Sequence, residues 1–482
     1  MAKHSIKVLD CDLHLTNLQT RMPFKYGIAT MTRVPHGFVR VRAEVEGKPS
    51  IGIAADLLPP KWFTKDPDKP VIDEVLDMMR VIRHAADAAK SLSGSSTFDV
   101  WQQLYRVQDA WGAQEKLAPL LTHFGTSLVE RALIEAACRA YNTPFAEALR
   151  TNRLGVRLGD IHVSLQNRAP SDFLAAKPLD EVILRHTVGL VDPLVDQHIA
   201  AGSKLNDGLP QSLAACIKAY DLRHFKIKVT GHLDHDLDRL DQIARVLEVE
   251  AKPDYRFSLD GNEQFKSLTD FRSFWQAVIG SATLREFLKH LLFVEQPLHR
   301  DQALQAAARE LFSGWPERPS IIIDESDGTL ESLPMALNLG YAGTSHKNCK
   351  GIFKGIANRC LLKQMERARP GSTYIMSGED LCTIGPVSVL QDLTVMAALG
   401  IQSVERNGHH YFPGLSIFSK EIQAQVLGAH PDLYRLTGSG WPALDIEDGT
   451  VKVRSLNAQP FGAGFEVDVG KFTPAGEFRP QV

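Results

Sequence analysis

The most informative absences in this 482-residue sequence concern cysteine and charge. Its six cysteines are scattered without C-x-x-C spacing, which argues against a disulfide framework and against a cysteine-based zinc motif. The 54 Lys and Arg residues nearly balance the 57 Asp and Glu residues, and like charges form no block, so nucleic acid is not an expected partner. The free cysteines favour a reducing, cytoplasmic compartment.

Long apolar runs are also missing. The first ten residues, MAKHSIKVLD, contain no apolar signal segment, and no later stretch approaches the roughly 18 apolar residues that a membrane-spanning helix needs. We therefore expect an unexported protein without a membrane partner. The sequence also has no G-x-G-x-x-G, P-loop or G-x-S-x-G motif, which leaves nucleotide binding and serine-hydrolase chemistry unsupported.

Residues 1–150 have the pattern of an α+β domain. Alternating apolar and polar residues predict three antiparallel strands, followed by amphipathic helices with apolar positions three and four residues apart. The predicted strands lie in IKVLDCDLHL (6–15), FVRVRAEVEG (38–47) and PSIGIAAD (49–56), and the helices within 71–90 and 126–149. Strands followed by helices in this order predict a separate α+β layer.

Residues 151–440 instead alternate short apolar runs with amphipathic stretches. The eight runs are 182–190, 224–229, 255–262, 291–298, 320–326, 343–350, 372–380 and 401–408. Eight runs at this spacing predict an α/β fold of the TIM-like (β/α)8 barrel type. Residues 441–482 do not continue the repeat and are expected to add further β structure.

Charged residues gather at the ends of these runs. In HFKIKV, Lys226 and Lys228 are two positions apart, so they project from the same face of a strand and need anions or solvent opposite. Asp260, Glu295 and Asp324 end the next three runs, where a barrel places its active site. A single acid there is commonly a helix cap, but three converging carboxylates suit Mg²⁺.

These motifs together resemble the enolase superfamily, in its mandelate racemase and muconate lactonizing enzyme branches. The matching segments are FKIKV, LDGN, VEQP, DES and HKNCKG, in this order, and RMPFKYGIAT resembles the specificity loop of an N-terminal capping domain. The resemblance implies a modified enolase-type barrel over 151–440, a capping domain over 1–150, and a segment, 441–482, that returns to the cap.

The resemblance also implies roles for individual residues. Asp260, Glu295 and Asp324 correspond to ligands of Mg²⁺, for which Mn²⁺ can substitute, and Lys228 to the base on one face of the substrate. Lys226 corresponds to an electrostatic helper and Lys347 to the lysine of the opposite face. Two lysines on opposite faces, as in the muconate lactonizing branch, imply abstraction of the proton α to a carboxylate through a metal-stabilised enediolate.

Several outcomes of that chemistry stay open in the sequence. The expected reaction of the small carboxylate substrate is racemisation, epimerisation or cycloisomerisation. An acid-sugar dehydratase is favoured instead if His409, His410 and arginines of the cap line the pocket, although both histidines are expected in a loop. A barrel that binds a carboxylate without turning it over is the third reading. Relatives of this type also suggest a homo-oligomer.

Overall fold

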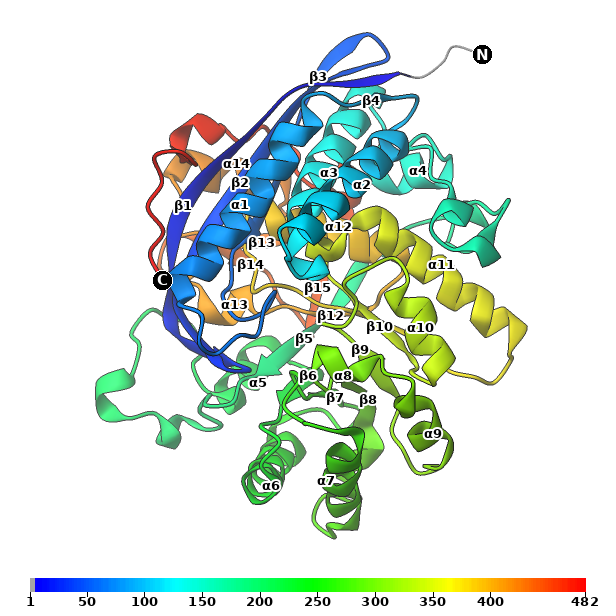
Figure 1. Cartoon of the computed structure of the whole chain (residues 1–482). Coiled ribbons are helices and arrows are strands. Elements are labelled where there is room, and N and C mark those ends of the chain that lie inside the picture. The colour runs from blue at the N-terminus through cyan, green and yellow to red at the C-terminus, as the bar shows by residue number, and fades with distance from the viewer. Residues whose placement is uncertain (1–4) are drawn as a thin grey trace.

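The computed structural model describes residues 5–482, and their N-terminal part is built on long antiparallel strands (Figure 1). β1 (Ile6–Tyr26), β2 (Ala29–Val45) and β3 (Lys48–Leu57) form a meander. Valines at 39, 41 and 45 face the core while Arg42 and Glu44 face outward, because side chains alternate across a strand. The three predicted strands are present and longer than expected. RMPFKYGIAT forms the end of the β1–β2 hairpin, not an irregular loop.

Helices cover one face of this sheet. They are α1 (Val71–Ala89), α2 (Thr97–Gln114), α3 (Pro119–Tyr141) and α4 (Phe145–Arg150). α3 is buried along nearly its whole length and lies directly on β3, where a side chain at Gly52 would come within 2.0 Å of the Ala132 carbonyl oxygen. Glycine at this position is what allows the helix to approach the sheet so closely.

The second part of the chain is a closed barrel of eight parallel strands. These are β5 (Glu181–Val188), β6 (His224–Lys228), β7 (Arg256–Asp260), β8 (Leu291–Glu295), β9 (Ile321–Ile323), β10 (Gly343–His346), β11 (Ile375–Gly378) and β12 (Ser403–Glu405). Each pairs with the next, and β12 pairs with β5. The predicted α/β barrel with an antiparallel N-terminal domain is confirmed.

Helices follow most of the barrel strands and surround the barrel (Figure 1). They are α5 (Leu213–Tyr220), α6 (Leu233–Glu250), α7 (Leu268–Gly280), α8 (Arg300–Ala303), α9 (Ala307–Ser313), α10 (Ser332–Leu339), α11 (Ile352–Ala368), α12 (Ser388–Leu399), α13 (Gly408–Tyr411), α14 (Lys420–Ala429) and α15 (Arg454–Asn457). Within residues 5–482, no helix combines the length and the apolar character that crossing a bilayer demands.

The last part of the chain contacts both sheets. A small hairpin, β13 (Tyr434–Leu436) and β14 (Pro442–Leu444), precedes β15 (Thr450–Lys452), which pairs antiparallel with the start of β5. β16 (Thr473–Pro474) pairs with β1, as does the short β4 (Ser93–Gly94). The domain boundaries at 150 and 440 remain a prediction, since the tail belongs to neither layer alone.

Candidate active site

All six residues singled out in the sequence lie at one end of the barrel. Lys226 and Lys228 belong to β6, Asp260 and Glu295 are the last residues of β7 and β8, and Asp324 and Lys347 directly follow β9 and β10. All six are buried. The carboxyl ends of parallel strands meet at one rim, so residues distant in the chain are brought to one site.

Lys226 lies at the centre of this group. Its Nζ is 3.1 Å from Asp260, 2.9 Å from Glu295, 2.6 Å from Glu379 and 3.2 Å from Glu405, in each case measured to a carboxylate oxygen. Burial lowers the pKa of Lys226, but attraction to these four acids outweighs it and raises the pKa well above its usual value. Lys226 therefore remains a cation and cannot serve as a base.

The other two lysines each hold one predicted metal ligand. Lys228 Nζ donates to Asp260 Oδ2 at 2.9 Å and also to Asn262, while Lys347 Nζ donates to Asp324 Oδ2 at 2.8 Å. In the closed barrel, β6 and β10 are four strands apart in either direction. Lys228 and Lys347 therefore approach the three acids from opposite sides.

The protonation of Lys347 follows from its single close acid. Burial lowers the pKa of Lys347, but the attraction of Asp324, together with that of Glu379 and Glu295, outweighs it, so the net effect is a pKa above the usual value for lysine. The ammonium group also lies 5.1 Å from the centre of the Trp62 ring, a favourable cation–π distance. Lys347 is therefore protonated in this structure and can act as a proton donor.

Among the three predicted ligands, Glu295 has the negative charge that its surroundings compensate least. Burial and the nearby Glu379 raise its pKa well above the usual value, more than Lys226 lowers it. Its Oε2 is buried and accepts no hydrogen bond, although Lys226 Nζ is 2.9 Å away in poor alignment. An unpartnered carboxylate oxygen among other carboxylates is a position at which an added cation is stabilising.

These observations bear on whether the site suits Mg²⁺. The predicted ligands are all carboxylates, the donor type that Mg²⁺ prefers, and Glu295 Oε2 accepts no hydrogen bond that an ion would have to displace. In this arrangement, however, the ammonium of Lys226 lies among the acids. The three acids do not form a group of ligand atoms within 4.8 Å of one another; the one such group found in residues 5–482 lies elsewhere. The donor set fits the ion, and Lys226 must shift to admit it.

The structure adds polar residues that the sequence did not assign. Glu379 follows β11 and pairs with Arg185, and Glu405 ends β12 and accepts from Thr187 at 2.6 Å. The rule used for the other strand ends, applied to the last two runs, would have found both acids. Glu325, the neighbour of Asp324, accepts a hydrogen bond at 3.2 Å from Asn262, the residue that also binds Lys228.

His409 and His410 do not reach this site. They belong to the short helix α13, not to an exposed loop; His410 is buried and His409 half-buried, and neither is among the residues that line the cavity at the barrel mouth. Among the described residues, no arginine lines that cavity either. The observation that would have favoured a sugar-acid dehydratase is therefore not met.

The cavity itself is small and half apolar. Its volume is about 40 Å³, enough for only a few water molecules. The cap contributes Phe24, Tyr26 and Met31 from the β1–β2 hairpin, which contains the segment that resembles the specificity loop, and Trp62 from the segment after β3. Opposite them lie the lysines with Asp260 and Asp324, so the cavity has a charged floor and an apolar roof.

Comparison with known proteins agrees with this architecture. No family model and no curated protein sequence matches the chain. Among solved structures, an N-succinyl Arg/Lys racemase from Bacillus cereus aligns with a TM-score of 0.61 and 14% identity, covering 97% of this chain and 98% of that one. A muconate lactonizing enzyme from Pseudomonas fluorescens, complexed with muconolactone, gives 0.59 and 14%, covering 96% and 98%.

A third neighbour is a dipeptide epimerase from Enterococcus faecalis, complexed with Mg and the dipeptide L-Leu-L-Tyr. It aligns with a TM-score of 0.57 and 15% identity, covering 84% of this chain and 92% of that one. These structures confirm the resemblance to the enolase superfamily at the level of the fold. At such identities they do not test the roles of individual residues, which remain predictions.

Proposed function

We propose that this chain is a metal-dependent enzyme that removes the proton α to a carboxylate and can return a proton to either face of the same carbon. Racemisation or epimerisation is the reaction that fits best. The observation that carries the proposal is the placement of Lys228 and Lys347 on opposite strands of the barrel, each in contact with a different predicted metal ligand. A substrate bound between them would present one face to each.

Asp260, Glu295 and Asp324 would hold the ion. When bound, Mg²⁺ supplies positive charge that stabilises the negative charge developing on the substrate carboxylate. Lys226 remains cationic beside this position and adds to the same stabilisation, which is the role of an electrostatic helper and not of a base.

The two outer lysines would move the proton. In one direction, neutral Lys228 accepts the α proton on its Nζ while protonated Lys347 delivers a proton to the opposite face of the carbon; in the other, the roles exchange. The charged state of Lys347 fits the donor role. Both side chains are buried, so bulk water does not compete with them for the carbanionic carbon.

The lining of the cavity bears on the substrate. Its roof of Phe24, Tyr26, Met31 and Trp62 favours an apolar group near the reacting carbon over several hydroxyl groups. This supports an amino-acid-like carboxylate, such as a dipeptide or an N-acyl amino acid, over a sugar acid, and the roof must move away from the floor to admit a substrate of that size. Cycloisomerisation, which uses one lysine only, leaves the second without a role.

Deuterium exchange tests the proposal. The protein with Mg²⁺ would be incubated in D₂O with a panel of dipeptides and N-succinyl amino acids of both configurations, and the α position followed by NMR. We expect deuterium to enter both enantiomers or epimers of one substrate class. A barrel that only binds carboxylates would incorporate none, and a one-base enzyme would exchange one configuration and not the other.

A further inference from the structure

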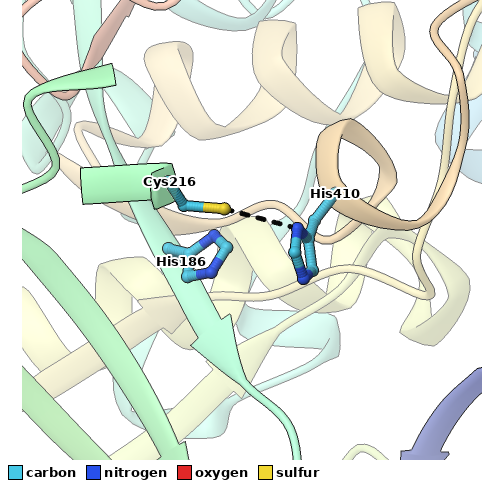
Figure 2. Close-up of side chains that lie close together, drawn as sticks. All are labelled: His186, Cys216 and His410. Carbon is cyan, nitrogen blue, oxygen red and sulfur yellow. Dashed lines mark hydrogen bonds between the residues drawn. The ribbon is translucent and has the colours of Figure 1, made fainter. Parts of the chain in front are cut away.

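A second group of chemically reactive side chains lies outside the barrel wall. His186 of β5, Cys216 of α5 and His410 of α13 converge, each from a different element (Figure 2). In β5, Arg185 and Thr187 contact Glu379 and Glu405 inside the barrel, so His186 between them points outward. All three residues are buried. This group shares no residue with the candidate active site.

The geometry of the three side chains is close to that of a metal site. One potential ligand atom from each residue lies within 4.8 Å of the other two. Cys216 Sγ is 3.5 Å from His410 Nδ1. Two ligands at zinc–sulfur and zinc–nitrogen bond lengths in a tetrahedral arrangement are about 3.6 Å apart. The observed separation thus needs no rearrangement along that edge.

Partners behind the histidines resemble those that orient metal-binding imidazoles. The Nε2 of His410, the nitrogen facing away from Cys216, lies 4.0 Å from Asp192 Oδ2. That carboxylate is itself fixed by Tyr411 Oη at 2.7 Å and by the Gly189 amide at 2.8 Å. His186 Nδ1 lies 3.1 Å from His409 Nε2. His409 is thus within hydrogen-bond distance of His186, whereas Asp192 lies near His410 without a hydrogen bond and would need a small shift to orient its ring.

Burial places the histidines in the form that binds metals. It lowers the pKa of His186 to about 4, and it lowers the pKa of His410 well below the usual value. Both rings are therefore neutral near pH 7. Burial raises the pKa of the Cys216 thiol, so binding must release its proton to solvent. The resulting thiolate and Asp192 together balance the two charges of a divalent ion.

We propose that His186, Cys216 and His410 bind one zinc-class divalent ion, with a water molecule in the fourth position. Two imidazoles and a thiolate suit Zn²⁺ and its cobalt substitute, whereas Mg²⁺ prefers oxygen ligands. The spacing of Cys216 in the sequence gave no zinc motif, because its partners are 30 residues before it in β5 and far along the chain after β12.

Such an ion would stabilise the segments next to the candidate active site without contacting its residues. It would tie α5 and β5 to α13, which begins directly after Asn407, and Asn407 donates a hydrogen bond to Glu405 at 3.0 Å. The His410 carbonyl also accepts a hydrogen bond at 2.8 Å from Arg21 in the cap hairpin. One ion would thereby stiffen the strand-end loop and its contact with the cap.

Cobalt spectroscopy tests the site directly. The full-length protein would be freed of metal with a chelator and titrated with Co²⁺, following the thiolate-to-cobalt charge-transfer band in the near ultraviolet. We expect a band that saturates at one equivalent and is displaced by Zn²⁺. Cys216→Ser should abolish this band. It should also weaken zinc binding by at least tenfold to a hundredfold, because changing a residue that merely supports a metal ligand already lowers affinity by that factor. Zn²⁺ should also raise the Tm of the wild type.

Matched variants separate this site from others. Cys360→Ser changes another buried cysteine and should leave the band unchanged, as should Glu295→Gln, which alters only the predicted Mg²⁺ site. His410→Gln should weaken zinc binding even if Cys216→Ser fails to fold. Wild-type protein that gives no thiolate band, or a band that survives Cys216→Ser, would overturn the proposal and leave the three residues as a hydrogen-bonded cluster.

Discussion

Two buried cations, one in the cap and one in the barrel, have very different surroundings. Arg131 of α3 donates to Asp56 at 2.9 Å, to the Ala55 carbonyl at 3.1 Å and to the Ser127 carbonyl at 3.2 Å. Lys226 of β6 contacts four carboxylates. Arg131 pairs with one acid and fills its remaining donors with neutral oxygens. Lys226 is surrounded by more negative charge than it can neutralise.

The difference distinguishes a structural ion pair from a site built for a ligand. A buried pair is tolerable when each charge is matched and hydrogen-bonded, as in the cap. The barrel mouth instead crowds several acids around one ammonium group, and Glu295 keeps an oxygen without a hydrogen bond. Crowding of buried like charges is costly, so it is a common sign of a functional site.

The largest expected effect is on the rate of the proposed reaction, which should depend on the lysines at the barrel mouth and not on Arg131 in the cap. Lys228→Ala and Lys347→Ala should each lower turnover of a confirmed substrate by about 10² to 10⁴, the contribution of a positioned proton-transfer group. The measurement is α-proton exchange in D₂O from each enantiomer separately, where each variant should lose one face preferentially. If Lys347→Ala leaves rate and stereochemistry untouched, the two-lysine mechanism is wrong. Arg131→Lys, in the cap, serves as the control.

The next effect concerns stability. Arg131→Met and Lys226→Met each leave buried acids without their cation, and breaking such a pair costs about 3–5 kcal/mol in the free energy of unfolding. The comparison predicts that Mg²⁺ restores much of the loss in Lys226→Met and none in Arg131→Met. Denaturant unfolding with and without Mg²⁺ measures both. Equal responses to the ion would contradict the distinction drawn between the two cations.

A smaller effect is expected from Glu295→Gln. Removing this acid relieves repulsion at the barrel mouth, so the Tm without metal should rise, while affinity for Mg²⁺ should fall by about tenfold or more. Asp56→Asn is the counterpart in the cap and should lower the Tm without changing Mg²⁺ affinity. Calorimetric titration and thermal melts provide the values; unchanged Mg²⁺ binding in Glu295→Gln would exclude it as a ligand.

The smallest effect concerns pH and the cap. His36 of β2 is fully buried against Ser388, and burial lowers its pKa to about 3. Above about pH 6.5 the ring is neutral in both the folded and the unfolded protein, so the stabilisation from burying it is complete. As the pH falls from there toward 3, the unfolded ring binds a proton and the folded ring does not, so this stabilisation is lost. The free energy of unfolding should be measured at several pH values for the wild type and for His36→Gln. Near pH 5, its slope against pH should differ between the two proteins by about 1.4 kcal/mol per pH unit. Parallel curves would contradict this assignment.

Much of the fold could be predicted because its signals are local. Each of the eight apolar runs, which are six to nine residues long, overlaps a barrel strand of three to eight residues and precedes a helix. The alternation in residues 38–47 likewise predicted β2. By contrast, α2 was not singled out, and the end of the β1–β2 hairpin was expected as a loop because RMPFKYGIAT resembles the specificity loop of the family.

The site was predictable only in part, because its contacts join distant residues. Asp260, Glu295 and Asp324 follow from their positions at strand ends, and the motifs HFKIKV and HKNCKG locate the lysines. That Lys226 would contact Glu379 and Glu405 depends on barrel closure, which brings β11 and β12 next to β5 and β6. The convergence of Cys216 with two histidines has the same cause and left no sequence motif.

The tail has a consequence for the order of events during synthesis. Residues 472–481 run beside β1: the Ala475 amide donates to the Leu13 carbonyl at 3.0 Å, and the Gln481 amide donates to Asn17. Phe472 also stacks on Phe38 of β2 at 4.2 Å. Figure 1 shows this C-terminal segment along the same edge as β1. The ribosome synthesises β1 and its partner β2 well before β16, the strand that pairs with the outer edge of β1. A nascent cap therefore emerges with an open strand edge, available to chaperones or to other chains until translation of this segment is complete.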